Sequence, residues 1–297
     1  MTGSTSATTL EEAIAPTTAA QYYNSNEDAV AALALTGCAS GSAPAGSESP
    51  AADAGYVTPG KLTIATGETA YEPYVIGDDP ESGEGFEAAV AYAVAEELGF
   101  AADDVEWVRT SFESAIAPGP KSFDFNIQQY TITDERKQAV DFSSPYYEAS
   151  QSVVALEGGG AEGVTDLAGL KDLVLGAMSG STSATTIEEA IAPTTAPQLY
   201  SSNEDAVAAL KAGQIDAIVL DTPTAYTAVN FYIEDSFTVG ELPAAGVPDQ
   251  WGLLLAKDSP LTADVTAAVD ALRENGTLDE LEEEWLSVLS EGVPQLQ

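Results

Sequence analysis

One stretch, a strand followed by a polar turn and an arginine, constrains this chain more than any other. Phe123, Phe125 and Ile127 alternate with polar residues, which is the period of a half-buried strand. Thr133 can then cap a short helix that has Arg136 in its first turn. An arginine beside free backbone N–H groups at a helix start is a site for a carboxylate, because the guanidinium fork binds two oxygens at once.

A second interpretation of Arg136 is a surface arginine paired with Asp134 or Asp141. The surrounding sequence favours the interpretation of Arg136 as part of a carboxylate-binding site. Residues 130–137 read Tyr-Thr-Ile-Thr-Asp-Glu-Arg-Lys and residues 140–147 read Val-Asp-Phe-Ser-Ser-Pro-Tyr-Tyr. This run resembles the signature of family 3 extracellular solute-binding proteins, the amino-acid receptors of ABC importers. The resemblance covers roughly residues 60–290.

Charge and composition exclude several classes of function. The chain has 297 residues, with 48 acidic and 9 basic side chains and a formal charge of −39. Such a balance repels nucleic acid and anionic lipid surfaces. The absence of histidine removes histidine triads and histidine metal sites, and one cysteine allows no intrachain disulfide. We therefore expect no nucleic-acid partner, no metal and no cofactor.

The N-terminal segment repeats an internal one. Residues 1–33 copy residues 178–210 and differ from them at five positions: Thr2, Leu10, Ala20, Tyr22 and Asn24. Two copies so far apart do not make a solenoid, which needs adjacent units. The first copy also lacks the strand 173–177 that precedes the second. We interpret residues 1–33 as a recombination or assembly product and expect them to be poorly ordered.

A lipobox-like motif follows the copy. Residues 35–40, Leu-Thr-Gly-Cys-Ala-Ser, place Cys38 where a lipoprotein signal has its lipidated cysteine, although a chance Leu-x-Gly-Cys is the alternative. No Lys or Arg precedes Lys61, so an intact signal n-region is missing. Residues 34–59 combine the motif with a flexible tether rich in Ser, Gly, Ala and Pro. The resemblance implies an extracytoplasmic protein anchored through Cys38.

Strands and helices alternate from Lys61 onward, which is typical of the α/β class. The patterns predict strands at 62–66, 105–108, 123–127, 152–156, 173–177, 215–220 and 251–256, and helices at 86–98, 203–212, 262–275 and 277–289. A further helix begins at Ser111 and is cut short by Pro118 and Pro120. The resemblance implies a two-lobed, type II periplasmic-binding fold with two hinge crossings and a cleft between the lobes. Residues 61–154 plus 251–297 would form lobe 1 and residues 155–250 lobe 2.

The resemblance also assigns roles to cleft residues. Arg136 would clamp the ligand carboxylate, helped by Thr131, Ser181 and Thr182, while Asp221 and the backbone carbonyl of Gln129 would hold the ammonium. Tyr71 and Phe112 would contact the ligand side chain, and Glu68 would recognise the end of that side chain.

Most of these residues have a structural alternative. Asp221 could cap a turn before Pro223, Thr182 could be only an N-cap, and Glu68 could be solvated. Tyr71 and Phe112 could be core residues. Gln128 and Gln129 replace the small residues that are usual in the family, which leaves the identity of the ligand open.

Two classes of function remain. The first is a monomeric receptor that binds a free L-amino acid by closing its lobes and then docks on the transmembrane subunits of an ABC permease. The second is a cleft enzyme of the same fold, dehydratase-like, with Glu68 as the acid. We favour the receptor. Of the nine basic residues only Arg136 maps to the cleft, with Arg109 as a possible exception, so a polar or cationic amino acid fits better than an acidic one.

Overall fold

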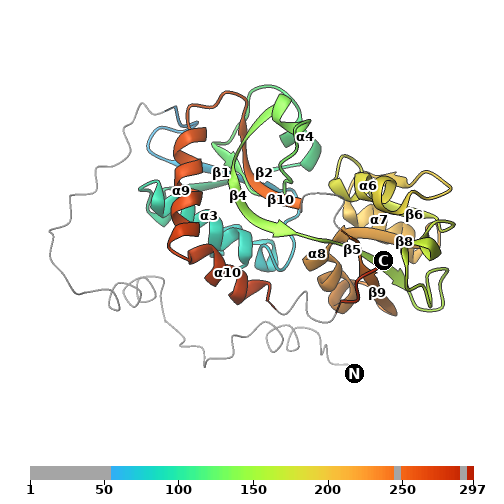
Figure 1. The fold of residues 1–297 in the computed structure, drawn as a ribbon. Coiled ribbons are helices and arrows are strands. Elements are labelled where there is room, and N and C mark those ends of the chain that lie inside the picture. Colours follow the sequence, from blue (N-terminus) through green and yellow to red (C-terminus); the bar gives the residue numbers. More distant parts are fainter. Residues whose placement is uncertain (1–54, 244–248, 288–292) are drawn as a thin grey trace, which may run out of the picture. The chain divides into compact units, whose positions relative to one another are not determined.

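The computed structural model describes residues 55–243, 249–287 and 293–297, all within one compact unit, Pro50–Gln297. The repeated segment 1–33, Cys38 and most of the predicted tether 34–59 lie outside the described residues. The expected α/β class and two-lobed fold are confirmed, because the described strands form two five-stranded mixed sheets with helices on both faces (Figure 1).

The first sheet has the strand order β2-β1-β3-β10-β4. Its strands are β1 (Leu62–Gly67), β2 (Val105–Thr110), β3 (Phe125–Asn126), β4 (Val140–Ala149) and β10 (Asp249–Ala256). Its helices are α3 (Phe86–Glu97), α4 (Phe112–Ile116), α9 (Thr262–Glu274) and α10 (Thr277–Trp285), with short 3-10 segments η1 (Ile76–Asp78), η2 (Pro80–Ser82), η3 (Ala102–Asp104) and η4 (Arg136–Gln138). Helices α3, α9 and α10 bury their apolar side chains on one face, and α4 covers the other (Figure 1).

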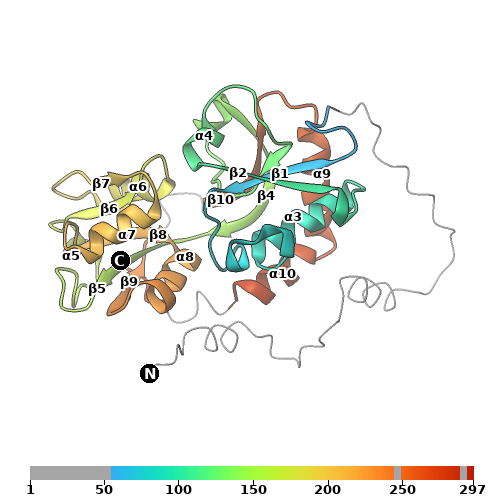
Figure 2. The same cartoon turned by 180° about the vertical axis from the view of Figure 1, so that it is seen from behind.

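The second sheet has the strand order β7-β6-β8-β5-β9. Its strands are β5 (Gln151–Leu156), β6 (Leu175–Met178), β7 (Gln198–Tyr200), β8 (Ala217–Asp221) and β9 (Ser236–Glu241). Its helices are α5 (Leu167–Leu170), α6 (Thr182–Thr186), α7 (Asn203–Lys211) and α8 (Thr222–Thr227), and π-helical turns η5 (Ile187–Ile191) and η6 (Ala228–Tyr232) extend α6 and α8. Helix α7 packs on one face of this sheet with α8, while α5 and η5 pack on the other (Figure 2).

The chain crosses between the sheets in two strand connections. Strand β4 belongs to the first sheet and β5 to the second, so the first crossing is at Ser150. The second crossing lies between β9 and β10. The expected boundary between residues 154 and 155 therefore falls inside β5, because this strand pairs with β8 and β9 along its whole length.

The C-terminal residues 293–297 correct the expected extent of lobe 1. Gln295 forms a β-bridge with Glu241, and Leu296, only 2% exposed, is buried in the core of the second lobe. A side chain at Gly240 would collide with Leu296 and with the carbonyl of Pro294, so glycine at this position lets the tail approach β9. The segment 251–297 is thus divided between the two lobes.

In each sheet three parallel strands have their carboxyl ends at the same edge. In the first sheet β1 runs parallel to β2 and β3, and in the second β6 runs parallel to β7 and β8. Ligands of open α/β sheets bind beyond the carboxyl ends of such strands, where the strand order reverses. The residues that follow β1, β2, β3, β6, β7 and β8 are therefore the first place to look for a site.

Candidate functional site

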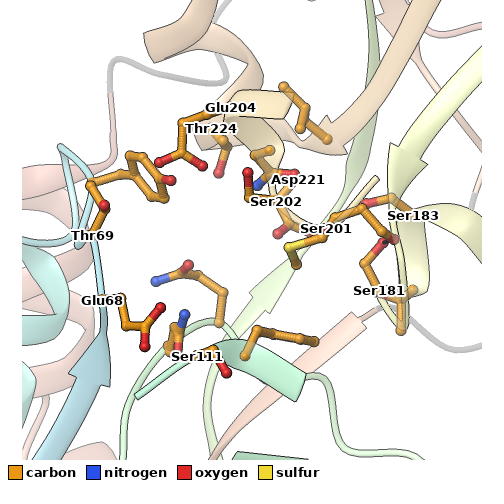
Figure 3. A pocket seen from close by; sticks show the side chains of 18 of the residues that line it. Glu68, Thr69, Ser111, Ser181, Ser183, Ser201, Ser202, Glu204, Asp221 and Thr224 are labelled. Carbon is orange, nitrogen blue, oxygen red and sulfur yellow. Dashed lines mark hydrogen bonds between the residues drawn. The ribbon is translucent and has the colours of Figure 1, made fainter. Parts of the chain in front are cut away.

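A cavity of about 340 Å³ lies beyond the carboxyl ends of these six strands and takes its walls from both lobes. The first lobe contributes Glu68, Thr69, Tyr71, Ser111, Phe112, Gln128, Gln129 and Arg136. The second lobe contributes Met178, Ser181, Thr182, Ser183, Ser201, Ser202, Asn203, Glu204, Leu220, Asp221 and Thr224 (Figure 3). Eight of the nine predicted binding residues line this one cavity. Thr131 is the exception: its hydroxyl lies 3.2 Å from that of Thr182, outside the lining.

Arg136 is the cation of the cavity and is almost buried, with 7% of its surface exposed. It begins a 3-10 turn, η4, rather than lying inside a helix, and its backbone N–H donates to the hydroxyl of Thr133 at 3.1 Å. Its side chain donates to the carbonyl oxygens of Thr131 at 2.7 Å and of Gly180 at 2.8 Å. The guanidinium carbon lies 5.4 Å from the ring centroid of Phe112. These contacts hold the guanidinium group in one orientation and leave further N–H groups of Arg136 for a ligand.

The interpretation of Arg136 as a surface ion pair is wrong. Asp134 and Asp141 pair with lysines instead: Asp134 Oδ1 lies 3.5 Å from Lys137 Nζ, and Asp141 Oδ1 lies 2.9 Å from Lys257 Nζ. No carboxylate among the described residues is within ion-pair distance of Arg136. Burial lowers the pKa of the guanidinium, which contacts two carbonyl oxygens and the ring of Phe112, while the more distant charges of Asp249, Asp221 and Glu135 partly offset this shift. A buried cation without an ion-pair partner is suited to bind an anionic group.

Asp221 ends β8 and lines the cavity from the second lobe. It occupies the N-cap position of α8, yet its side chain makes no capping hydrogen bond, so the capping role alone is not supported. The side-chain amide of Gln151 donates to Asp221 and, at 2.7 Å, to Asp249. Burial and the neighbouring charge of Asp249 raise the pKa of Asp221 to about 7. Two carboxylates sharing one amide donor attract a further donor, such as an ammonium group.

Two more carboxylates face the cavity. Glu68 follows β1, and Glu204 lies in the first turn of α7 (Figure 3). Burial and the nearby carboxylate of Glu204 raise the pKa of the Tyr71 phenol. Phe112 stacks on Tyr130 with ring centroids 4.7 Å apart. Tyr71 and Phe112 both touch a hydrophobic cluster and line the cavity, so the two roles weighed for them coexist.

Gln129 has an unusual backbone. Its φ is +50°, a left-handed conformation that residues with a Cβ rarely adopt. Its N–H donates to Glu87 Oε1 at 2.8 Å, and its side-chain amide donates to the other oxygen of the same carboxylate. Gln128 accepts a hydrogen bond from the hydroxyl of Tyr130 at 2.8 Å. Both glutamines are therefore held by protein groups, although both still line the cavity.

Sequence reasoning missed several residues of this site. Glu204 was not expected there because β7, three residues long, has no recognisable alternation. Ser202 caps α7 by accepting a hydrogen bond from the N–H of Asp205, and it also lines the cavity. The signal that finds them is topological, since both follow the carboxyl end of a strand parallel to β6.

The described residues contain no cluster of three or more Asp, Glu, Cys or His side chains suited to a metal ion. Among the same residues, no helix combines the length and apolar character needed to cross a bilayer. The described residues instead form a polar cavity lined by one cation, Arg136, and by three carboxylates, those of Glu68, Glu204 and Asp221.

Comparisons with known proteins identify the family of this chain. Residues 62–288 match the model of the bacterial extracellular solute-binding proteins, family 3, and the chain belongs to this family. Proteins of this family are extracytoplasmic. The expected family is therefore confirmed.

Individual relatives are amino-acid-binding proteins rather than enzymes. The L-arginine-binding protein of Pseudomonas aeruginosa is 29% identical over 234 residues, which cover 74% of this chain and 86% of that protein. The ABC transporter glutamine-binding protein GlnH of Bacillus subtilis is 29% identical over 214 residues, covering 70% and 75%. A solved structure, an ancestral arginine-binding protein bound to glutamine, is 30% identical with a TM-score of 0.64 and covers 76% of this chain and 97% of that one.

Proposed function

We propose that this chain is the extracytoplasmic receptor of an ABC importer and binds an L-α-amino acid with a polar or cationic side chain. One observation carries the proposal: a buried arginine without an anionic partner shares a cavity with three carboxylates. An amino acid satisfies both ends at once. Its carboxylate meets Arg136, and its ammonium meets Asp221.

The preference for a polar or cationic side chain follows from the remaining charges. Glu68 and Glu204 line the cavity and have no basic partner among the ion pairs of the described residues. Arg109, which sequence alone left as a possible second cation, is 2.6 Å from Asp78 and also donates to the carbonyl of Gly67. A second ligand carboxylate would face acids instead of bases, whereas an amide or a cation is stabilised there. The formal charge of −39 adds a long-range field of the same sign.

Contacts between the two lobes support the proposed closure around the ligand. The hydroxyl of Tyr74 lies 2.9 Å from that of Thr224, and Arg136 of the first lobe donates to Gly180 of the second. A ligand held by Arg136 and Asp221 adds contacts of the same kind and stabilises the closed form. We further propose that the closed monomer docks on the transmembrane subunits of an ABC permease and is tethered to the membrane through a lipid on Cys38.

Calorimetric titration with arginine, lysine, histidine, glutamine, glutamate and aspartate tests the function. The proposal expects one ligand per chain, with tightest binding among the first four. Mass spectrometry of the ligand after prolonged incubation should find it unchanged. Tightest binding of glutamate or aspartate would refute the ligand class and make Arg109 the next residue to replace. A product would refute the receptor and favour an enzyme with Glu68 as its acid.

A further inference from the structure

A buried carboxylate lies behind the cavity without lining it. Glu87 is in the first turn of α3 and is fully buried, with 0% of its surface exposed. Burial raises its pKa to about 7. The helix packs in an apolar core, where a nonpolar side chain would avoid the cost of desolvating a carboxylate. An acid at this position therefore needs a reason other than packing.

The hydrogen bonds of Glu87 supply that reason. Its Oε1 accepts from the backbone N–H of Gln129 at 2.8 Å and from the hydroxyl of Tyr146, and its Oε2 accepts from the side-chain amide of Gln129. The backbone N–H and the side-chain amide of Gln129 thus both donate to one carboxylate. The hydroxyls of Tyr74 and Tyr130 are further titratable groups near Glu87, and the charge of Glu87 contributes to the raised pKa of Asp221.

Gln129 needs such a partner. With φ at +50° it is a non-glycine residue in the left-handed region, and it lines the cavity beside Gln128. A residue with a Cβ leaves that region unless surrounding contacts hold it there. Among its recorded hydrogen bonds, those to Glu87 are the ones that fix both its backbone and its side chain.

We propose that Glu87 is a positioning residue for ligand binding: it holds Gln129 in its left-handed conformation from behind, so that ligand affinity depends on a carboxylate which the ligand does not touch. The proposal rests on the proposed amino-acid receptor function and deepens it. It assigns to Gln129 a backbone geometry that the sequence alone does not provide, and to α3 a role in the site at the end of β3.

The test compares Glu87→Ala with Val90→Ala. Val90 is a matched control because it lies one turn along α3, is fully buried in the same core and is not part of the cavity lining. Both variants should lower the melting temperature. Only Glu87→Ala should weaken binding of the tightest amino acid from the titration panel, by about tenfold or more, since a hydrogen-bonded charged group is lost behind the site. Val90→Ala should stay within about twofold of the parent protein.

Amide hydrogen exchange in the ligand-free protein gives a second readout. The N–H of Gln129 should be protected in the parent protein and should exchange much faster in Glu87→Ala, with Val90→Ala close to the parent at that amide. Glu87→Gln should restore affinity to within about threefold. Its carbonyl oxygen can accept from the same N–H and from Tyr146, while its NH₂ can donate to the rotated amide of Gln129.

Three results would overturn the proposal: unchanged affinity in a folded Glu87→Ala, an equal loss in Val90→Ala, or no protection of the Gln129 N–H in the parent protein. The last is measured without any variant, so the proposal stays testable if Glu87→Ala does not fold. If the parent protein binds no amino acid, the proposed function fails. The exchange experiment still decides whether Glu87 holds Gln129.

Discussion

Replacing Arg136 by methionine separates ligand binding from folding. Methionine keeps most of the buried stem but removes the charge, the N–H donors and the guanidinium that lies against the ring of Phe112. In the unliganded protein the change removes two hydrogen bonds, to the carbonyls of Thr131 and Gly180, and also removes a buried cation without an anionic partner. Since the lost bonds destabilise the fold and the lost burial of charge stabilises it, the net change should stay below about 2 kcal/mol.

The cost to binding should be larger. A guanidinium has five N–H donors, and two go to carbonyl oxygens, which leaves donors for both oxygens of a ligand carboxylate. Truncating one partner of a buried, hydrogen-bonded charge pair costs about 2–5 kcal/mol. At about 1.4 kcal/mol per decade, affinity should fall by about 30-fold to a few thousandfold.

Calorimetry with the tightest amino acid measures the loss, and thermal unfolding without ligand measures the fold. Arg273→Met is the matched control, because Arg273 is a partly exposed arginine of α9, 3.0 Å from Asp270 and outside the cavity. It should bind as the parent does. Wild-type affinity in Arg136→Met would refute the assignment of the carboxylate site. Equal losses in both variants would mean that the effect is general electrostatics.

Three further predictions concern pH and closure. Because the pKa of Asp221 is raised to about 7, the carboxylate proposed to hold the ammonium is ionised at pH 8 but mostly protonated at pH 6, and ligand affinity should be about tenfold weaker at pH 6. Calorimetric titrations of Asp221→Asn should show no such pH dependence. A pH-independent affinity of the parent protein would contradict the role of Asp221. The buried carboxylate of Glu87 has a pKa of about 7, so ionising it lowers the stability of the parent protein as the pH rises from the ordinary pKa of a glutamate through about 7. Denaturant unfolding should therefore find Glu87→Gln more stable than the parent by up to about 3 kcal/mol at pH 8 and nearly equal to it at pH 5. A larger difference at pH 5 than at pH 8 would contradict this prediction. Tyr74→Phe removes the 2.9 Å bond to Thr224 between the two lobes and should weaken affinity about fivefold, because we expect that bond to stabilise the closed form. Unchanged calorimetric affinity would mean that the bond contributes nothing to closure.

Local patterns predict the elements near the cavity well. The apolar spacing of 86–98 and the serine before Phe112 predict α3 and α4, and the short run 62–66 predicts β1. Each of these elements can be recognised from residues adjacent in the sequence. The family motif then places Arg136, which spacing alone could not distinguish from a surface arginine.

What the sequence does not reveal depends on contacts between distant residues. Strand β7 is recognisable only from its pairing with β6, so Glu204 is not predicted. The tail at Leu296 lies against Gly240, a contact that no local pattern encodes. Glu87 reads as an ordinary acid in the first turn of a helix, where acids are favoured. Its burial becomes visible only when β3 and β4 bring Gln129 and Tyr146 to the same carboxylate.

A crystal structure of the protein with its tightest amino acid tests the central claim most directly. The account predicts the ligand carboxylate on the guanidinium of Arg136, the ammonium on Asp221, and the side chain directed toward Glu68 and Glu204. A ligand bound elsewhere, or one with its carboxylate away from Arg136, would contradict it.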